Sequence, residues 1–484
     1  MIRSMKNRSL KGYITVYLSL NLSVLLTLIL MLLQGAAIKT IRFKTECVMD
    51  IGLESIFAEY HRELLKQYGL LFIDSSYGTA VADSEKTKGR LIHYLNLNFE
   101  DNGYGLVFKD LTATRADNAM LSNISYATDQ CGEVLRYQID RYMKVKYGLA
   151  YVPALMNNSV DAEGMMSQYD GYDSGRRSAH DEVDSIMESV NAKLEEEEEP
   201  YSISNPADSV EYMSESNVLF YAMGDTSGTA FKNANIYDLI SHRSYTDGTG
   251  LRSYQAKADG MDTKLLLTDY IYDKCGYYKK EKPDSKLLYE VEYIIAGKSS
   301  DIENMEEIAG RIFKIRYAIN MGYLLSSGSK QAEAEAMALA ATSAVGLPEL
   351  TEAVKYTILF SWGYAESAKD LRILYDGHRL PLIKDDANWN TPLSQMVDFK
   401  SHLGEYSVVG GEMDYKAFLD LFLLAQSIEN TTMRLMDVME MDIRLTPGNG
   451  AFRMDAQIYQ LTGEVNVSGR YGYGCSIKRN YSYE

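Results

Sequence analysis

The most distinctive hydrophobic pattern lies near the beginning of the chain, where the 21 residues from 13 to 33 include no charged side chain. At 1.5 Å per residue, a helix of that length covers about 30 Å, the thickness of the hydrocarbon layer of a membrane. The segment is apolar on every side and has no polar stripe that would face water. We therefore predict a transmembrane helix over residues 13–37, preceded by a basic leader over residues 1–12.

A cleaved signal peptide and an assembly tail are the alternatives to a permanent anchor. A secretory signal needs an apolar core of only about 7–15 residues, which is shorter than this run. Gly35, Ala36 and Ala37 resemble a small-residue cleavage site, but the long apolar core favours retention of the helix. The same small residues would let another helix approach closely near the outer membrane face.

Basic residues flank the apolar segment on both sides: Arg3, Lys6, Arg8 and Lys11 before it, and Lys39, Arg42 and Lys44 after it. The small excess on the N-terminal side favours a cytoplasmic N-terminus. We predict a single-pass protein of the cell membrane in which residues 38–484 form a large extracytoplasmic domain.

Apolar residues continue at helical spacing beyond the predicted span, and Gly52 is the only helix-breaking residue before Gly69. The anchor and this stretch together predict one helix of about 55 residues, roughly 80 Å long, that runs towards Tyr68. Ile41 and Ile51 belong to its apolar stripe. Because water disfavours such a stripe, we expect it to pack against the protein's own body or against a partner's helix.

The rest of the chain alternates between helical and strand patterns. Helices are predicted over 129–147, 178–194, 301–370 and 415–442, and strands over 70–74, 106–121, 287–297 and the tail segments 452–461, 463–469 and 474–483. Strands so far apart in sequence favour one composite antiparallel sheet in a single domain. The predicted fold class is α+β, with a long N-terminal helix and a mostly helical body.

The charge of the chain is strongly acidic, with a formal net charge of −18. This charge argues against a nucleic-acid surface. Residues 161–199 alone hold 13 acids and three bases. We interpret an acidic insertion at about 158–210 as a solvated helix followed by a flexible linker, and a cation-binding arm is the alternative.

The sequence contains none of the common motifs for catalysis or cofactor binding. The chain lacks the G-x-S-x-G nucleophile motif, a close histidine pair for zinc and a three-glycine dinucleotide fingerprint. Gly297-Lys298-Ser299 resembles the end of a phosphate-binding loop, but Glu292 occupies the position that needs glycine. Ser300 and Glu303 instead predict the cap of a helix. We predict no enzymatic activity, no metal site and no cofactor.

The four cysteines are Cys47, Cys131, Cys275 and Cys475. Their wide spacings match no metal-ligand set, since such a set needs close pairs. Isolated buried thiols are the simplest interpretation, and the three possible disulfide pairings stay open.

Several sequence blocks resemble an uncharacterised clostridial family of membrane-anchored proteins that is encoded alongside tight-adherence (Tad) pilus or type II secretion-like machinery. The blocks span nearly the whole chain: KGYITVYLSL, ECVMDIGLESIFAEYHRELLKQYGLLFID, LYEVEYIIAGKSSDIEN, LFSWGYAESAKDLRILYDGHRLPLIK and MDVMEMDIRLTPGN. The resemblance implies a membrane location and protein partners in such an assembly, but it brings no assigned activity.

A looser resemblance is to the pseudopilins of Tad systems, whose leader ends in glycine directly before an apolar helix. It implies processing between Gly12 and Tyr13. Pilins usually carry glutamate at the fifth mature position, whereas this chain has Tyr17 there. Together, the two resemblances imply a non-enzymatic, pseudopilin-like component of a cell-surface apparatus. A monomeric membrane-tethered binding or sensor ectodomain is the second hypothesis, and an exported hydrolase with a dispersed site is the third.

Overall fold

The computed structural model describes residues 6–100, 113–147, 161–194, 217–224, 231–245, 247–252, 260–344, 346–408, 410–469 and 472–483. The chain divides into two compact units. Unit 1 comprises Met1–Gln138, Tyr245–Lys257 and Thr446–Glu484, and unit 2 comprises Ile139–Ser244 and Ala258–Leu445. Helices dominate the chain, and unit 1 also holds a four-stranded antiparallel sheet, so the predicted α+β class is confirmed.

Unit 1 is built from segments near both ends of the chain. Its helices and strands are α1 (Lys6–Phe57), α2 (Arg62–Tyr68), β1 (Ile73–Asp74), α3 (Ser84–Glu100), β2 (Arg115–Tyr126), the start of α5 (Asp129–Tyr147), η4 (Met454–Ala456), β3 (Gln457–Ser468) and β4 (Gly474–Ser482). Strand β3 pairs antiparallel with β1, β2 and β4. The composite sheet therefore joins strands that lie more than 300 residues apart, as the sequence predicts.

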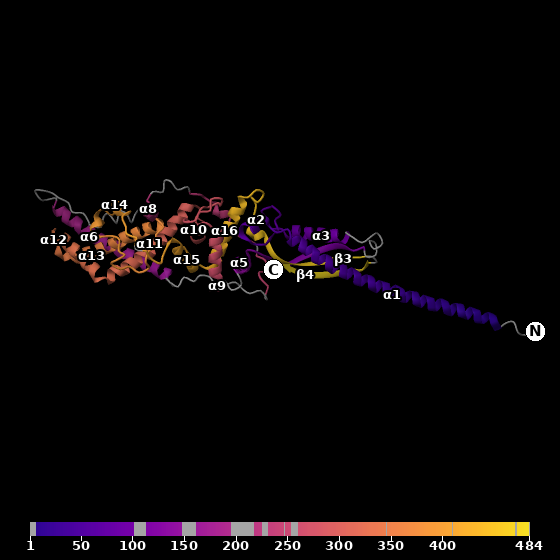
Figure 1. Ribbon diagram of the computed structural model, residues 1–484. Helices are drawn as coiled ribbons and strands as arrows, with labels where there is room; N and C mark the ends of the chain where they lie inside the picture. Colours follow the sequence, from indigo (N-terminus) through magenta and orange to yellow (C-terminus); the bar gives the residue numbers. More distant parts are fainter. Residues whose placement is uncertain are drawn as a thin grey trace, which may run out of the picture. The chain divides into compact units, whose positions relative to one another are not determined.

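The core of unit 1 lies between the sheet and two helices, α1 and α3, which run along the same face of it (Figure 1). Residues of both helices, β2 and β3 form one buried apolar cluster that includes Val48, Leu53, Leu95 and Val465. Gly52 does not interrupt α1. A Cβ at this position would lie 2.8 Å from the side chain of Leu95, so the glycine allows α3 to approach closely.

Helix α1 ends at Phe57, earlier than the predicted extension towards Tyr68. Tyr60 forms a bridge with Ile73, which turns the chain out of the helix. His61 then caps a separate helix, α2, by accepting a hydrogen bond from the Leu64 backbone at 3.2 Å. Because this turn belongs to the sheet, helical periodicity alone did not reveal it.

The predicted strands of unit 1 differ in their limits. The expected strand at 70–74 shortens to β1. Residues 106–112 lie outside the described residues, and the rest of the strand predicted over 106–121 corresponds to β2, which begins at Arg115 and continues to Tyr126. The separate strands predicted at 452–461 and 463–469 form the single strand β3, which runs through Gly463. A Cβ on Gly463 would lie 2.7 Å from the Met49 methyl carbon, so this glycine provides space for α1 and does not mark a turn.

The described part of unit 2 is helical. After the end of α5, its elements are α6 (Ala162–Leu194), α8 (Val218–Met223), η1 (Ile236–Asp238), α9 (Met261–Lys274), α10 (Glu290–Ala296), α11 (Asp301–Ser326), α12 (Gly328–Ala344), η2 (Pro348–Leu350), α13 (Thr351–Tyr375), η3 (Leu393–Asp398), α14 (Phe399–His402), α15 (Tyr415–Ala425) and α16 (Ile428–Arg444). Helices α11 and α13 pack against each other and also contact α6 and α8.

The strand predicted over 287–297 is wrong, since this segment contains the helix α10. Glu290 and Glu292 alternate with apolar residues, as they would in a strand with one solvent-facing side, but both carboxylates are buried. Glu290 accepts a hydrogen bond from the Gly276 backbone at 2.8 Å, and Glu292 accepts one from the Tyr278 backbone at 2.9 Å. The polar positions therefore bind backbone amides inside the unit, and the apparent period of two reflects these bonds.

Three predicted helices have different boundaries. The helix expected to start at Ser178 is part of α6, which begins at Ala162. Because α6 packs against α11 and α13, this helix is not fully solvated. The acids at 195–199 lie outside the described residues. The stretch 301–370 divides into α11, α12 and α13. The helix predicted over 415–442 divides into α15 and α16, because Ser427 caps α16.

Candidate functional site

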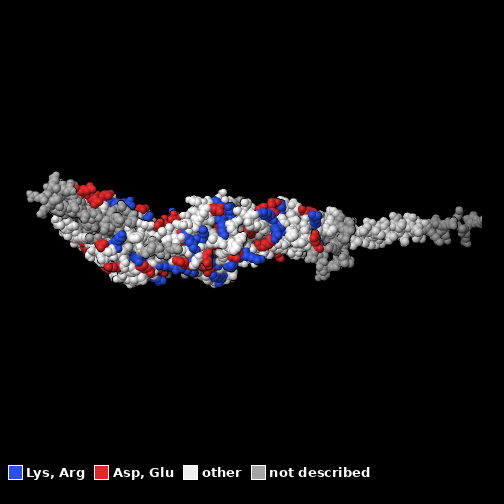
Figure 2. Space-filling view, turned by 90° about the horizontal axis from the view of Figure 1, so that it is seen from above, with Lys and Arg blue, Asp and Glu red and all other residues white. Residues whose placement is uncertain are grey.

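The first candidate site is the part of α1 that precedes the core of unit 1. Its side chains are exposed from Tyr13, at 76%, through to Leu33, at 61%. In Figure 2 this segment carries no charged residue. Among the described residues, one helix is long and apolar enough to cross a membrane, and none of its most apolar window is buried. An apolar surface of this extent indicates contact with lipid or with another protein.

The predicted processing and association residues lie within this same helix. Gly12 and Tyr13 are inside α1, which begins at Lys6. Gly35 and Ala36 are exposed and Ala37 is partly exposed, and a Cβ on Gly35 would meet no atom within 4 Å. The small-residue surface is therefore open to a neighbouring helix. Processing at Gly12–Tyr13 stays a prediction.

The structure separates Ile41 from Ile51, which the sequence placed on one stripe. Ile41 is 3% exposed and packs within unit 1, whereas Ile51 is 43% exposed. Phe43 is 68% exposed and Cys47 is also exposed, so residues 43, 47 and 51 follow each other at helical spacing on the outer side of α1. Sequence reasoning missed Phe43 and Cys47. Residues 43, 47 and 51 are spaced four apart, so they share a face of α1 that does not include Ile41. This spacing is the sequence signal for the outer face.

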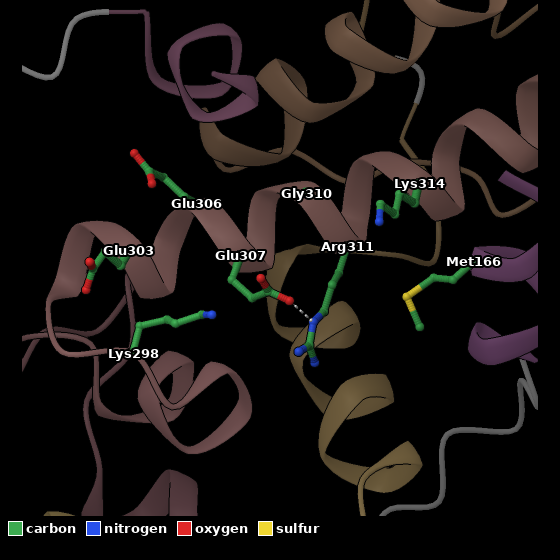
Figure 3. Close-up of a pocket in the computed structure, with 8 residues that line it drawn as sticks. All are labelled: Met166, Lys298, Glu303, Glu306, Glu307, Gly310, Arg311 and Lys314. Atoms are coloured by element: carbon green, nitrogen blue, oxygen red, sulfur yellow. Dashed lines mark hydrogen bonds and ion pairs between the residues drawn. The ribbon is translucent and has the colours of Figure 1, made fainter. Parts of the chain in front are cut away.

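The second candidate site is a groove of about 630 Å³ along α11 in unit 2 (Figure 3). Its lining residues come from α6, from the segment between α10 and α11, and from α11 itself: Met166, Lys298, Glu303, Glu306, Glu307, Gly310, Arg311 and Lys314. In Figure 3 the side chains of Lys298 and Met166 point towards the Glu307–Arg311 pair from opposite sides. The volume falls within the range of about 300–1,000 Å³ that is typical of small-molecule sites.

The position of Lys298 in the groove is set by Asn304. The Asn304 side chain accepts a hydrogen bond from the Lys298 backbone amide at 2.8 Å and donates one to its carbonyl oxygen at 3.1 Å. Ser300 caps α11 by accepting from the Glu303 backbone at 3.3 Å, so the cap predicted from the sequence is confirmed. The chain therefore enters α11 in a fixed geometry, with Lys298 beside the first turns of the helix.

The acidic residues of the groove lie towards the start of α11. The hydroxyl of Ser299 donates to Glu303 at 2.7 Å, and together with Ser300 it lowers the pKa of this carboxyl group. Asn217 donates a hydrogen bond to Glu306. Both carboxylates are therefore bound by neutral hydrogen-bond donors.

The basic residues lie further along α11. Arg311 forms an ion pair with Glu307 at 2.8 Å, and the ammonium group of Lys314 lies 5.4 Å from the centre of the Tyr169 ring. Between the two ends, a Cβ on Gly310 would meet no atom within 4 Å, so the helix surface is open there. Glu303 and Glu306 therefore lie towards one end of the groove and Lys314 lies towards the other, while Lys298 lies beside Glu303 (Figure 3).

Two buried carboxyl groups of unit 2 have strongly shifted titration. Burial raises the pKa of Glu292 to about 7 and that of Asp437 to about 6. Glu292 accepts hydrogen bonds from the Tyr278 backbone and the Tyr415 hydroxyl, each at 2.9 Å, and Asp437 accepts one from the Tyr293 hydroxyl at 2.9 Å. Neither group lines the groove, and their partners indicate a role in packing α10 against α15 and α16.

Other candidate chemistry is sparse in the part of the chain that the structure describes. There, no group of three or more His, Cys, Asp or Glu residues is placed to hold a metal ion. All four cysteines are free, but the prediction that they are buried is wrong for three of them: Cys47 and Cys131 are exposed and Cys475 is partly exposed. Cys275 is buried, which raises the pKa of its thiol. The methionines Met433, Met436, Met439 and Met441 are buried core residues.

Comparison with known proteins places the chain in a family. Residues 195–469, more than half of the chain, match the model of DUF5702, a family of unknown function. The chain belongs to this family. No curated protein and no solved structure matches it. The match covers most of unit 2 and the central strand of unit 1, whereas the apolar part of α1 lies outside it. Membership of DUF5702 assigns no activity, so the relation to pilus or secretion machinery stays a proposal.

Proposed function

We propose that the protein is a non-enzymatic, single-pass membrane component of a Tad pilus or secretion-like cell-surface apparatus, with a pseudopilin-like role. The observation that carries this proposal is the division of α1 into two parts. Its first part is apolar and exposed, and its second part, from Ile41 onwards, contributes to the core of unit 1. A flexible tether needs only about 20 apolar residues and no such continuity.

The continuity of α1 has a mechanical consequence for a membrane protein. Because no break separates the apolar segment from the core of unit 1, rotation or displacement of the helix is transmitted to the sheet. An assembly of several such subunits would hold each unit 1 at a fixed height and orientation. In this proposal the N-terminus is cytoplasmic and the domain after residue 38 is extracytoplasmic.

The orientation is tested with a reporter enzyme that is active only outside the cytoplasm, fused after Glu484. We expect activity from cells that contain the full-length fusion. An inactive reporter on a full-length, membrane-inserted protein would contradict the proposed orientation. A second fusion that lacks residues 1–37 serves as the control and should stay inactive.

Lateral association is tested at the outer face of α1. Ile41 is unsuitable for this purpose because its replacement would disturb the core. We expect Phe43→Asp combined with Ile51→Asp to abolish co-purification with neighbouring pilus components while membrane insertion is kept. Val81→Asp, at an exposed apolar residue elsewhere in unit 1, is the matched control and should leave co-purification unchanged. If the double variant co-purifies with these components at the wild-type level, α1 serves only as a membrane tether.

Cys47 supplies an independent probe of the same face. A short bismaleimide added to membranes should give a crosslinked product that Cys47→Ser abolishes and Cys131→Ser retains, since both thiols are exposed. A product that depends only on Cys131 would place the association elsewhere.

The groove on α11 favours a second candidate function, a membrane-tethered binding or sensor ectodomain that works as a monomer. It has the size of a ligand site and presents charges of both signs. If Cys47 gives no crosslink and the α1 variants lose no partner, this second function takes precedence.

A further inference from the structure

Within the part of the chain that the structure describes, four charged groups in the α11 groove have no ion-pair partner of opposite charge. Glu303 and Glu306 are bound by neutral donors, namely Ser299 with Ser300 and Asn217. Among the described residues, no carboxylate pairs with the ammonium groups of Lys298 and Lys314. Elsewhere on the same helix, Glu307 and Arg311 show that α11 forms an ion pair where the spacing of four permits it.

The spacing of these groups sets the size of a complementary ligand. Glu306 and Lys314 lie eight residues apart on α11, which corresponds to about 12 Å along the helix axis at 1.5 Å per residue. An extended peptide covers that distance with about four residues. The open surface over Gly310 leaves room for its backbone, and the Met166 side chain offers an apolar contact at the edge.

We propose that this groove binds a short, extended peptide segment of a partner protein that carries a basic group at one end and an acidic group at the other. The basic group lies against Glu303 and Glu306. The acidic group lies against Lys314 at the other end of the groove. The Glu307–Arg311 pair in between contributes no net charge and leaves donors and acceptors for the peptide backbone.

Charge complementarity selects this ligand over the simpler alternatives. A purely acidic peptide would bring one end against two carboxylates, and a purely basic peptide would bring one end against Lys314. In both cases like charges would meet and weaken binding. The proposal does not depend on the membrane role of α1, so failure of one leaves the other intact.

The test uses the full-length protein in detergent and three end-capped hexapeptides, with affinities measured by isothermal titration calorimetry at low salt. The sequences are Lys-Lys-Ala-Ala-Glu-Glu, Ala-Ala-Ala-Ala-Glu-Glu and Lys-Lys-Ala-Ala-Ala-Ala. We expect the first peptide to bind at least tenfold more tightly than either of the others. We also expect its affinity to fall as salt is raised, because exposed charges are screened.

Two charge-neutralising variants assign the ends of the ligand. Glu306→Gln should weaken the peptides that contain lysine about five- to tenfold and leave Ala-Ala-Ala-Ala-Glu-Glu unchanged. Lys314→Gln should weaken the peptides that contain glutamate and leave Lys-Lys-Ala-Ala-Ala-Ala unchanged. Glu352→Gln removes the same charge from an exposed position on α13 outside the groove, and it should alter no affinity by more than twofold.

Three results would overturn the proposal. The first is the absence of saturable binding of Lys-Lys-Ala-Ala-Glu-Glu to the wild-type protein at millimolar concentration. The second is equal affinity for all three peptides, which would show that the groove does not distinguish a peptide with opposite charges at its two ends from a peptide charged at one end. The third is an equal effect of Glu306→Gln and Glu352→Gln, which would reduce binding to the general charge of the surface.

Discussion

Arg316 and Asp370 form an ion pair of 2.9 Å in the interior of unit 2, where neither side chain is exposed. Asp370 also pairs with Lys384 at 2.8 Å, and Lys384 reaches Glu366. Burial acts to raise the pKa of Asp370, but the two cations outweigh it, so its pKa is lowered. The network ties α11 to α13 and to the segment that contains Lys384.

Replacing one member of this network should be costly, because it leaves buried charge without compensation. We expect Asp370→Asn to lower the free energy of unfolding of unit 2 by about 3–5 kcal/mol. Both tryptophans, Trp362 and Trp389, belong to unit 2, so tryptophan fluorescence during denaturant titration reports on this unit.

The matched control for Asp370→Asn is Glu335→Gln, which removes the more exposed ion pair between Glu335 and Lys355. Exposed pairs contribute about 0–1 kcal/mol, so this variant should unfold almost as the wild type does. Equal losses from the two variants would contradict a special role for the buried network.

Glu292 makes the stability of unit 2 depend on pH. Its pKa in the folded protein is raised to about 7 by burial, from 4.5 in the unfolded chain. Between these values the folded state holds more protons, so this group lowers stability as the pH rises from about 4.5 to 7. Each pKa unit corresponds to about 1.4 kcal/mol, and the shift therefore amounts to roughly 3 kcal/mol.

The Glu292→Gln variant removes this titration while it keeps the shape of the side chain. We expect its stability relative to the wild type to be higher at pH 8 than at pH 5, as measured by denaturant titration at both values. The comparison of the two proteins cancels the contributions of other groups, such as Asp437. A difference that does not change with pH would show that Glu292 does not titrate in this range.

Gly297 ends α10 with a φ of 70°, in the left-handed region that favours glycine. A Cβ here would lie 2.6 Å from the Arg434 guanidinium carbon, and Arg434 binds the carbonyl groups of Ile294 and Ile295. We expect Gly297→Ala to destabilise unit 2 by about 1–2 kcal/mol from the backbone conformation alone. Thermal unfolding followed by tryptophan fluorescence measures the loss.

Gly322→Ala provides the opposite expectation within α11. A Cβ there meets no atom within 4 Å, and alanine is favoured over glycine in a helix interior by about 0.5–1 kcal/mol. This variant should unfold at a higher temperature than the wild type, whereas Gly297→Ala should unfold at a lower one. Destabilisation by both would point to a general intolerance of the unit to substitution.

Processing at the N-terminus is predicted between Gly12 and Tyr13. Mass spectrometry of the protein purified from membranes should identify Tyr13 as the first residue. The replacement Gly12→Leu should abolish this product. A mature chain that starts at Ile38 would instead show signal-peptide cleavage, and the anchor would be absent.

Sequence patterns correctly predicted the elements in which each face has the same kind of surroundings along its whole length. The long uncharged run gave the apolar part of α1, and the periodicity of Val134, Leu135, Ile139 and Met143 gave α5, in which all four are buried. The strand predicted for the α10 segment was wrong because Glu290 and Glu292 accept hydrogen bonds from the backbone amides of residues 276 and 278. Alternation alone does not distinguish solvent from a buried backbone amide.

The α11 groove was half visible in the sequence. Once a helix is predicted from residue 301, Glu303, Glu307, Arg311 and Lys314 fall on one side of it, because their spacings are three and four. The other side of the groove was hidden, since Met166 comes from a distant helix and the position of Lys298 depends on Asn304. Only tertiary structure brings these groups together.

The central place of β3 in the sheet determines when the protein can complete unit 1. The apolar side of α1 around Val48 is made early, but its partner strand begins at Gln457. At about 5–20 residues per second, the roughly 400 residues between them take about 20–80 s to synthesise. Throughout that interval the helix lacks the sheet that covers it. A chain that stops before residue 457 therefore lacks β3 and β4, so the part of the apolar face of α1 that these strands cover stays exposed until the last residues of unit 1 have been made.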